Sequence, residues 1–454
     1  MGSYKKVGLL AGAASVTLGG LAFGETTPAN DVDARLAALE QQYQTLKAET
    51  GSNWLNQARQ EEIRAMLQEV QADSSTRTSL LQNGGGAGWD NGHFYLASGD
   101  GNFRLQIAGQ VQTRYTYNMR DQITAADLED ELGEAIDDTD NAGFEMRRTK
   151  LAFSGNLFGP DLTYKVQGAF GRDDGVFTLE HAWAAWALGN GWSFYWGQLK
   201  APFLHEELVS SSRQLAVDRS YVNSMFTGGY TTGAGIGFNN DENFKFDFVY
   251  SDGAGNANTA WNDSVGTGGT EWSLTARAEF LGAGTWGQFS DYTSLGSSEF
   301  GFMIGGAVHW QNGEYGDTGT ETELFGWTVD ASLEGDGWNA AGYIVGLNTE
   351  PNGGASTDDW AFVVQGGAFL APEKFELFGR WEWLDFDGMS DNINIVTFGA
   401  NYYIDTRGHA WKWTNDVVWA LDNIPSDAAG IGLLTDAFGQ EDQLTFRSQM
   451  QILF

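Results

Sequence analysis

The histidines of this sequence are the first candidates for a general base or a metal ligand. They are His93, His181, His205, His309 and His409. None stands at the spacing of a zinc-binding pair, and the sequence shows no Gly-x-Ser-x-Gly nucleophile motif. The adjacent carboxylates Glu206 and Glu207 would face opposite ways on a strand, and the stretch 137–143 lacks the ligand spacing of a calcium loop. The sequence therefore predicts no enzyme, no metal site and no cofactor.

The charge balance restricts the possible partners. The chain has 25 basic and 60 acidic residues, a formal net charge of −35, so it would repel nucleic acid and attract cations. Alternatively, acidic loops keep the protein soluble or bind divalent ions at a lipopolysaccharide surface. The absence of cysteine excludes disulfides and thiolate chemistry, and it fits an exported protein.

The amino terminus has the pattern of an export signal. Lys5 and Lys6 precede an apolar run of small residues over 7–23, and Ala22-Phe23-Gly24 offers a small-x-small cleavage site. We expect residues 1–24 to be a cleavable signal peptide, with a retained membrane anchor as the alternative. No later stretch is apolar for long enough to predict a transmembrane helix.

Residues 25–83 have a helical period. Apolar residues repeat at coiled-coil spacing, and a helical pattern continues to Val70. The repeating residues are Val32, Leu36, Leu39, Tyr43 and Leu46. So few heptads are marginal alone, which leaves two possibilities: a self-associating periplasmic stalk or a solvated amphipathic linker. A glycine-rich linker is expected over 84–102.

From Phe103 onward the period becomes two, which is typical of β-strands. Phe103, Leu105 and Ile107 share one face, while Arg104 and Gln106 share the other. The same alternation recurs in segments separated by tight turns and long polar loops. A strand that is apolar on one face and wet on the other suits a membrane-spanning barrel. We predict an all-β fold, an antiparallel up-and-down transmembrane barrel of about sixteen strands over residues 103–454.

The last strand alternates to the end of the chain. Its apolar face carries Phe446, Met450, Ile452 and Phe454. A closing strand has to pair with the first one, because unpaired backbone groups are costly in lipid. The terminal phenylalanine also resembles the signal that the outer-membrane barrel-assembly machinery recognises.

Several segments resemble the phosphate-selective porin O and P family. They are 144–151, with its paired arginines, 157–159, 196–203, 206–211, 218–220 and 398–403. The resemblance covers the chain from about Phe103 and implies a sixteen-strand trimeric porin with an inward loop near 201–226. The candidate constriction residues that it implies are Lys200, His205, Glu206, Glu207, Arg213, Asp218 and Arg219. Alternatively, Lys200 and Glu206 pair with each other and pin the loop to the wall.

The basic residues on the predicted wet faces are scattered. They are Arg104, Arg114, Arg148, Lys150, Lys165, Arg380, Lys412 and Arg447. No lysine cluster is visible along the sequence, so phosphate selectivity is not expected. The acidic stretch between Asp127 and Asp140 would favour cations at the channel mouth, or would simply be a solvated loop.

Two classes of function fit these observations. The first is an outer-membrane pore for passive diffusion of small hydrophilic solutes and ions, with an anion- or phosphate-selective porin as the alternative. The second is a structural barrel that tethers the envelope through residues 32–70. The expected partners are outer-membrane lipid and lipopolysaccharide, two further copies of the chain in a homotrimer, the assembly machinery, and cell-wall or periplasmic components that contact the helices. Most aromatic residues are expected in an interfacial girdle rather than in sugar-stacking sites.

Overall fold

The computed structural model describes residues 37, 38, 40, 41, 85–90, 92–120, 140–259, 270–295, 299–313, 321–405, 408–426, 428–436 and 442–454. The chain divides into two units, residues 1–82 and 83–454. In the first unit the four described residues are helical. The predicted signal peptide and the rest of the predicted coiled coil lie outside the described residues. No described helix is both long and apolar enough to cross a membrane.

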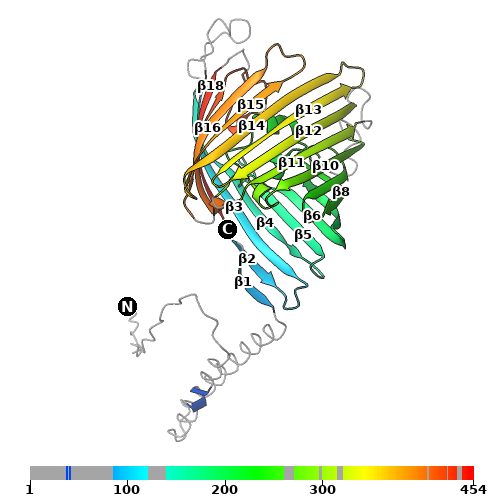
Figure 1. The fold of residues 1–454 in the computed structure, drawn as a ribbon, viewed down its shortest axis with the longest axis vertical. Helices are drawn as coiled ribbons and strands as arrows, with labels where there is room; N and C mark the ends of the chain where they lie inside the picture. The colour runs from blue at the N-terminus through cyan, green and yellow to red at the C-terminus, as the bar shows by residue number, and fades with distance from the viewer. Residues whose placement is uncertain are drawn as a thin grey trace, which may run out of the picture. The chain divides into compact units, whose positions relative to one another are not determined.

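Sixteen antiparallel strands form a closed barrel in the second unit, and Figure 1 shows them following one another around the wall. The strands are β3 (Arg104–Met119), β4 (Asn141–Asn156), β5 (Leu162–Phe170), β6 (Phe177–Gly189), β7 (Trp192–Lys200), β8 (Tyr230–Asn239), β9 (Phe244–Ser251), β10 (Trp272–Ala283), β11 (Gly301–Asn312), β12 (Thr322–Gly335), β13 (Trp338–Pro351), β14 (Thr357–Ala371), β15 (Phe375–Asp385), β16 (Ile393–Tyr403), β17 (Trp411–Ala420) and β18 (Gln443–Leu453). The predicted sixteen-strand barrel is confirmed.

The barrel closes where β18 pairs with β3, from Leu444 opposite Met119 to Leu453 opposite Gln110. Beyond the last strand residue, the amide of Gly109 donates to the carbonyl of Phe454 at 2.7 Å, and the amide of Phe454 donates back at 3.1 Å. The predicted pairing of the last strand with the first is therefore confirmed. Closure removes both sheet edges, as a lipid environment requires.

Strand β17 shows how the sequence pattern becomes an inside and an outside. Trp411, Trp413 and Trp419 are each more than 40% exposed, whereas Lys412 and Asp416 are at most 3% exposed. The apolar face thus points away from the barrel and the charged face points inward, the reverse of a soluble protein. This alternation is the one expected from the sequence.

Residues 84–102, predicted as a linker, contain a β-hairpin. Strand β1 (Gly86–Asp90) pairs with β2 (His93–Ala97), and β2 pairs with the first residues of β3. Trp89 and Phe94 pack edge to face with ring centroids 4.6 Å apart, and Asp90 forms an ion pair with Arg104 at 2.7 Å. The aromatic residues among the glycines explain why this segment is ordered as a hairpin.

The connections at the two ends of the barrel differ. One end carries tight turns, such as residues 336 and 337 between β12 and β13, as the sequence predicted. The other end carries the long connection between β7 and β8. Strand β4 begins at Asn141, directly after the acidic stretch that the sequence predicted as a loop, while residues 121–139 lie outside the described part of the chain.

Candidate functional site

The connection between β7 and β8, residues 201–229, folds back into the barrel, and we call it the constriction loop. It contains two short helices, α4 (His205–Leu208) and α5 (Tyr221–Phe226). Leu204, Tyr221 and Val222 are at most 1% exposed and belong to one apolar cluster with residues of β11 and β13–β17. Because this cluster lies on the inward face, the loop is packed against one half of the wall.

Two further segments, which were not predicted from the sequence, also fold inward. Residues 421–436, from the same end of the barrel as the constriction loop, contribute Ile424 and Leu433 to the apolar cluster. Residues 284–295, from the tight-turn end, place Tyr292 against Leu215 of the constriction loop. Together these segments fill the lumen beside β11–β17, so the open space lies along the opposite wall.

The carboxylate of Asp218 holds the constriction loop to three arginines. Arg147 Nε and Arg148 Nη2 each lie 2.6 Å from its oxygens, and Arg114 Nη1 lies at 3.1 Å. Burial opposes ionisation of Asp218, but the three positive charges outweigh that effect and hold its pKa well below the usual range. Asp218 is therefore an ionised anchor between the loop and strands β3 and β4.

A β-bulge explains how two adjacent arginines reach the same carboxylate. The register between β3 and β4 shifts after Gln112, so that Gln112 faces Arg148 while Thr113 faces Met146. The extra residue, Arg147, is left unpaired in the ladder, and its side chain joins that of Arg148 inside the barrel. The paired arginines noted in the sequence thus have a structural role, because both bind the carboxylate of the constriction loop.

Four of the other predicted wet-face cations make anchoring contacts, and two of these hold the constriction loop. Arg380 Nη2 donates to the Asp218 carbonyl at 2.8 Å, and Lys412 Nζ donates to the Gln214 carbonyl at 2.8 Å. Arg447 forms an ion pair with Asp416 of the neighbouring strand at 2.7 Å. Arg380, Lys412 and Arg447 are all buried, while Arg104 pairs with the hairpin. The structure therefore gives these four residues anchoring contacts.

The two carboxylates of α4 point to different partners. Glu206 accepts hydrogen bonds from the Ser220 amide at 2.9 Å and from the Tyr343 hydroxyl at 2.8 Å. Glu207 pairs with Lys200 Nζ at 2.7 Å. The suggested pairing of Lys200 with Glu206 is thus wrong, because α4 turns Glu207 toward the end of β7. Both residues also lie on a helix and not on a strand.

Charge keeps Glu207 ionised. Burial favours its neutral form, but the neighbouring charges of Arg219 and Lys200 lower its pKa to about 2. Arg219 also donates to the carbonyls of Glu206, Glu207 and Val209, at 3.0, 3.2 and 2.8 Å, and so secures the carboxyl end of α4. Lys200, Glu207 and Arg219 together fix the loop where it leaves the wall.

The other two predicted constriction residues face different surroundings. His205 is buried, with Nδ1 3.7 Å from a carboxylate oxygen of Glu279 on β10. Arg213 is exposed and donates to Ser290 Oγ at 2.9 Å, which connects the constriction loop to the inward segment 284–295. Neither residue lines the cavity described next.

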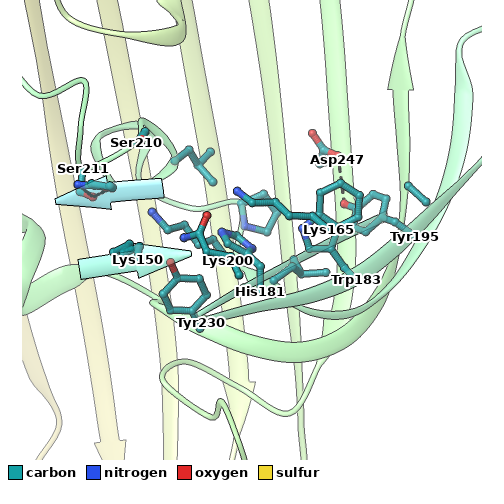
Figure 2. Close-up of a pocket in the computed structure, with 16 residues that line it drawn as sticks. Lys150, Lys165, His181, Trp183, Tyr195, Lys200, Ser210, Ser211, Tyr230 and Asp247 are labelled. Carbon is teal, nitrogen blue, oxygen red and sulfur yellow. Dashed lines mark hydrogen bonds between the residues drawn. The ribbon is translucent and has the colours of Figure 1, made fainter. Parts of the chain in front are cut away.

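A cavity of about 440 Å³ lies between the constriction loop and the wall of β3–β9. Figure 2 shows lysine, histidine and aromatic side chains from neighbouring strands around this space. The lining residues are Gln110, Lys150, Lys165, Gln167, His181, Trp183, Ala185, Tyr195, Leu199, Lys200, Pro202, Leu208, Ser210, Ser211, Tyr230 and Asp247. The expectation that the chain has no lysine cluster was wrong, because β4, β5 and β7 bring together three lysines that are distant in the sequence.

Two of the three lysines are neutralised locally. Lys150 Nζ lies 2.6 Å from Glu180 Oε1, and Lys200 pairs with Glu207. Among the described residues, Lys165 has neither an ion pair nor a side-chain hydrogen bond. Lys165 is therefore the lysine of the cavity that no described carboxylate neutralises through an ion pair.

The aromatic part of this cavity was not predicted from the sequence. Trp183 lies directly opposite Lys165 across β5 and β6. The Tyr195 hydroxyl is hydrogen-bonded to Asp247 at 3.0 Å, and the rings of His181 and Tyr230 lie edge to face at 5.0 Å. The sequence did offer one signal for it: Lys165 and Trp183 lie on the lumen-facing sides of two adjacent strands. Within the described residues, no three potential metal ligands come together.

Residues 116–420 match the phosphate-selective porin O and P family. The chain belongs to this family. A similar protein is an uncharacterized protein of Aquifex aeolicus (strain VF5), 24% identical over 299 residues that cover 61% of this chain and 68% of that one. Family and fold identify this porin as an outer-membrane channel.

Solved porin structures share the architecture. The anion-selective porin from Comamonas acidovorans superposes with a TM-score of 0.52 at 13% identity, covering 77% of this chain and 99% of that one. A loop L8 deletion mutant of OmpT, an outer membrane protein of Vibrio cholerae, gives a TM-score of 0.49 at 12% identity, with 77% and 99% covered. At these identities the first likeness establishes the barrel fold and nothing finer.

Proposed function

We propose that this porin passes small hydrophilic solutes and ions through the cavity beside the constriction loop, and that it favours anions there. The observation that carries the proposal is Lys165, an unpaired cation at the narrow part of a lumen whose other half is filled with protein. A charge that lines a constriction acts on every passing ion at close range and with little screening.

The overall charge of −35 would by itself favour cations. The acidic stretch between Asp127 and Asp140 carries part of that charge. At physiological ionic strength the Debye length is only about 8 Å. Mouth charges are therefore screened, whereas the charge at the constriction is not. Lowering the salt concentration should shift the selectivity toward cations, because the screening of the acidic loops weakens.

We also propose how the porin sits in the envelope. Residues 1–24 would be removed on export, the tight-turn end would face the periplasm with residues 25–83, and three copies would form the functional unit. The asymmetry between turns and long loops supports the orientation. The heptad pattern and the family resemblance support the homotrimer. Contact with the cell wall through residues 32–70 is compatible with the channel.

The test is a planar-bilayer recording on the purified full-length protein. We expect discrete conductance steps and, in a KCl gradient, a zero-current potential whose sign shows preference for chloride over potassium. Steps that occur in groups of three would support the trimer. A folded barrel without conductance, or a preference for potassium at 0.1 M salt or above, would contradict the proposal.

A further inference from the structure

We propose that the lysine-lined cavity selects monovalent organic anions that carry an aromatic ring over inorganic oxyanions. This inference rests on the proposed function, because it concerns what the same cavity admits. A volume of about 440 Å³ lies within the range of about 300–1,000 Å³ that is usual for organic ligands. A single tetrahedral oxyanion would leave most of this space to water.

The charged residues that line the cavity favour a solute with a single negative charge. Lys150 and Lys200 are already neutralised by Glu180 and Glu207, which leaves Lys165 as the available cation. Asp247 also lines the cavity, and in the described part of the chain its carboxylate accepts a side-chain hydrogen bond only from the neutral hydroxyl of Tyr195. A second negative charge on the solute would be repelled by Asp247 without gaining another cation. A carboxylate with a single charge avoids that cost.

The placement of Trp183 gives the solute its second contact. Lys165 and Trp183 are direct cross-strand partners on β5 and β6, and both line the cavity. Side chains in this relation have Cβ atoms about 4.5–5.5 Å apart. An ammonium group and an indole ring at that separation can be reached by the two ends of one small aromatic acid.

The remaining walls extend the apolar surface. Tyr195, Tyr230, Leu199 and Leu208 come from β7, β8 and α4, and all line the cavity. Lumen positions of a porin are usually polar, because they face water. Aromatic rings on this wet wall offer stacking that chloride or phosphate cannot use, whereas an aromatic ring in the solute gains from it.

The test measures how solutes block the potassium chloride current through wild-type porin in a planar bilayer. The probes are benzoate, acetate and inorganic phosphate, each added at the same pH and ionic strength. We expect benzoate to halve the current at a concentration roughly two- to tenfold lower than acetate does, the range that one aromatic contact contributes. Phosphate should be weaker than benzoate.

Variants assign the effect to the cavity. Trp183→Leu should abolish the advantage of benzoate over acetate, and Lys165→Gln should weaken block by both carboxylates. Trp186→Leu is the matched control, since Trp186 lies on the same strand but is 53% exposed on the outer face. Trp183→Phe retains an aromatic ring and should preserve most of the advantage of benzoate. It takes the place of Trp183→Leu in the comparison if that variant does not fold.

The outcomes separate this inference from the function on which it rests. Equal block by benzoate and acetate, or stronger block by phosphate, in a channel that prefers anions would overturn the inference and leave the pore intact. A channel that prefers cations would refute the proposed function itself. Loss of the benzoate advantage in Trp186→Leu as well would show that the effect does not arise in the cavity.

Discussion

Substitution of Asp218 by asparagine should release the constriction loop. Asp218 is the only carboxylate among the described residues that contacts Arg114, Arg147 and Arg148 together, at 3.1, 2.6 and 2.6 Å. Asparagine has nearly the same shape but removes the negative charge that faces two buried arginines, Arg114 and Arg148, and the partly buried Arg147. Breaking a buried ion pair by removing one partner costs about 3–5 kcal/mol, so the docked-to-undocked ratio of the loop should fall by a factor on the order of 10² to 10³.

The assay is single-channel recording of wild-type porin and the Asp218→Asn variant. We expect larger and noisier open-channel current, because the loop would sample positions away from the wall. Asp161→Asn is the control, since Asp161 is an exposed residue of the turn between β4 and β5. A variant with wild-type conductance and noise would show that the arginine cluster does not hold the loop.

Three further predictions concern the fold and the loop. Gly197→Ala should destabilise the barrel by at least about 1–3 kcal/mol, because φ at Gly197 is +116° and a Cβ would lie 2.1 Å from the Ala182 carbonyl oxygen. Urea denaturation monitored by gel mobility tests this prediction. Gly143→Ala is the control, since a Cβ at Gly143 would meet nothing within 4 Å. Deletion of Phe454 should lower the yield of folded barrel in the outer membrane, since it removes both backbone hydrogen bonds to Gly109; an unchanged yield would contradict this. Because the pKa of Glu207 is lowered to about 2, its stabilisation of the loop is fully present above the usual glutamate pKa and is lost progressively as pH falls from there through about 2. Open-channel noise should therefore be the same at pH 7 and pH 5 and should rise as pH is lowered toward 2.

The barrel could be predicted from the sequence because lipid imposes a strict rule on every strand. A residue in the wall faces either lipid or lumen. In the sequence Trp411, Lys412, Trp413, the alternation of apolar and charged residues therefore indicates which side chains face lipid and which face the lumen. Closure of β18 on β3 follows from the same rule, since an open edge in lipid is too costly. The inward loop near 201–226 was expected from resemblance alone, and its packing could not be predicted.

The cavity could not be predicted, for two physical reasons. Lys150, Lys165 and Lys200 become neighbours only through the register of β4 to β7, which short-range patterns do not specify. In addition, β-bulges at Arg147 and Glu180 break the alternation, so that the adjacent residues Arg147 and Arg148 bind the same carboxylate.

The inward segments 284–295 and 421–436 were also missed. Their buried residues, such as Tyr292 and Ile431, follow neither a helical nor a strand period, so nothing in the sequence distinguishes them from exposed loops. Because these segments fill the lumen beside β11–β17, the open space lies beside the lysines.

The zero-current potential of the Lys165→Glu variant in a KCl gradient tests directly whether the lysine-lined cavity sets the ion selectivity of the channel. Wild-type porin should show a potential of the sign that indicates anion preference, and Lys165→Glu should shift that potential toward cation preference. Lys374→Glu changes the formal charge by the same amount at an exposed turn between β14 and β15, and it should leave the potential unchanged. Equal potentials in all three proteins, or a cation preference in the wild type, would contradict the assignment of the lysine-lined cavity as the filter.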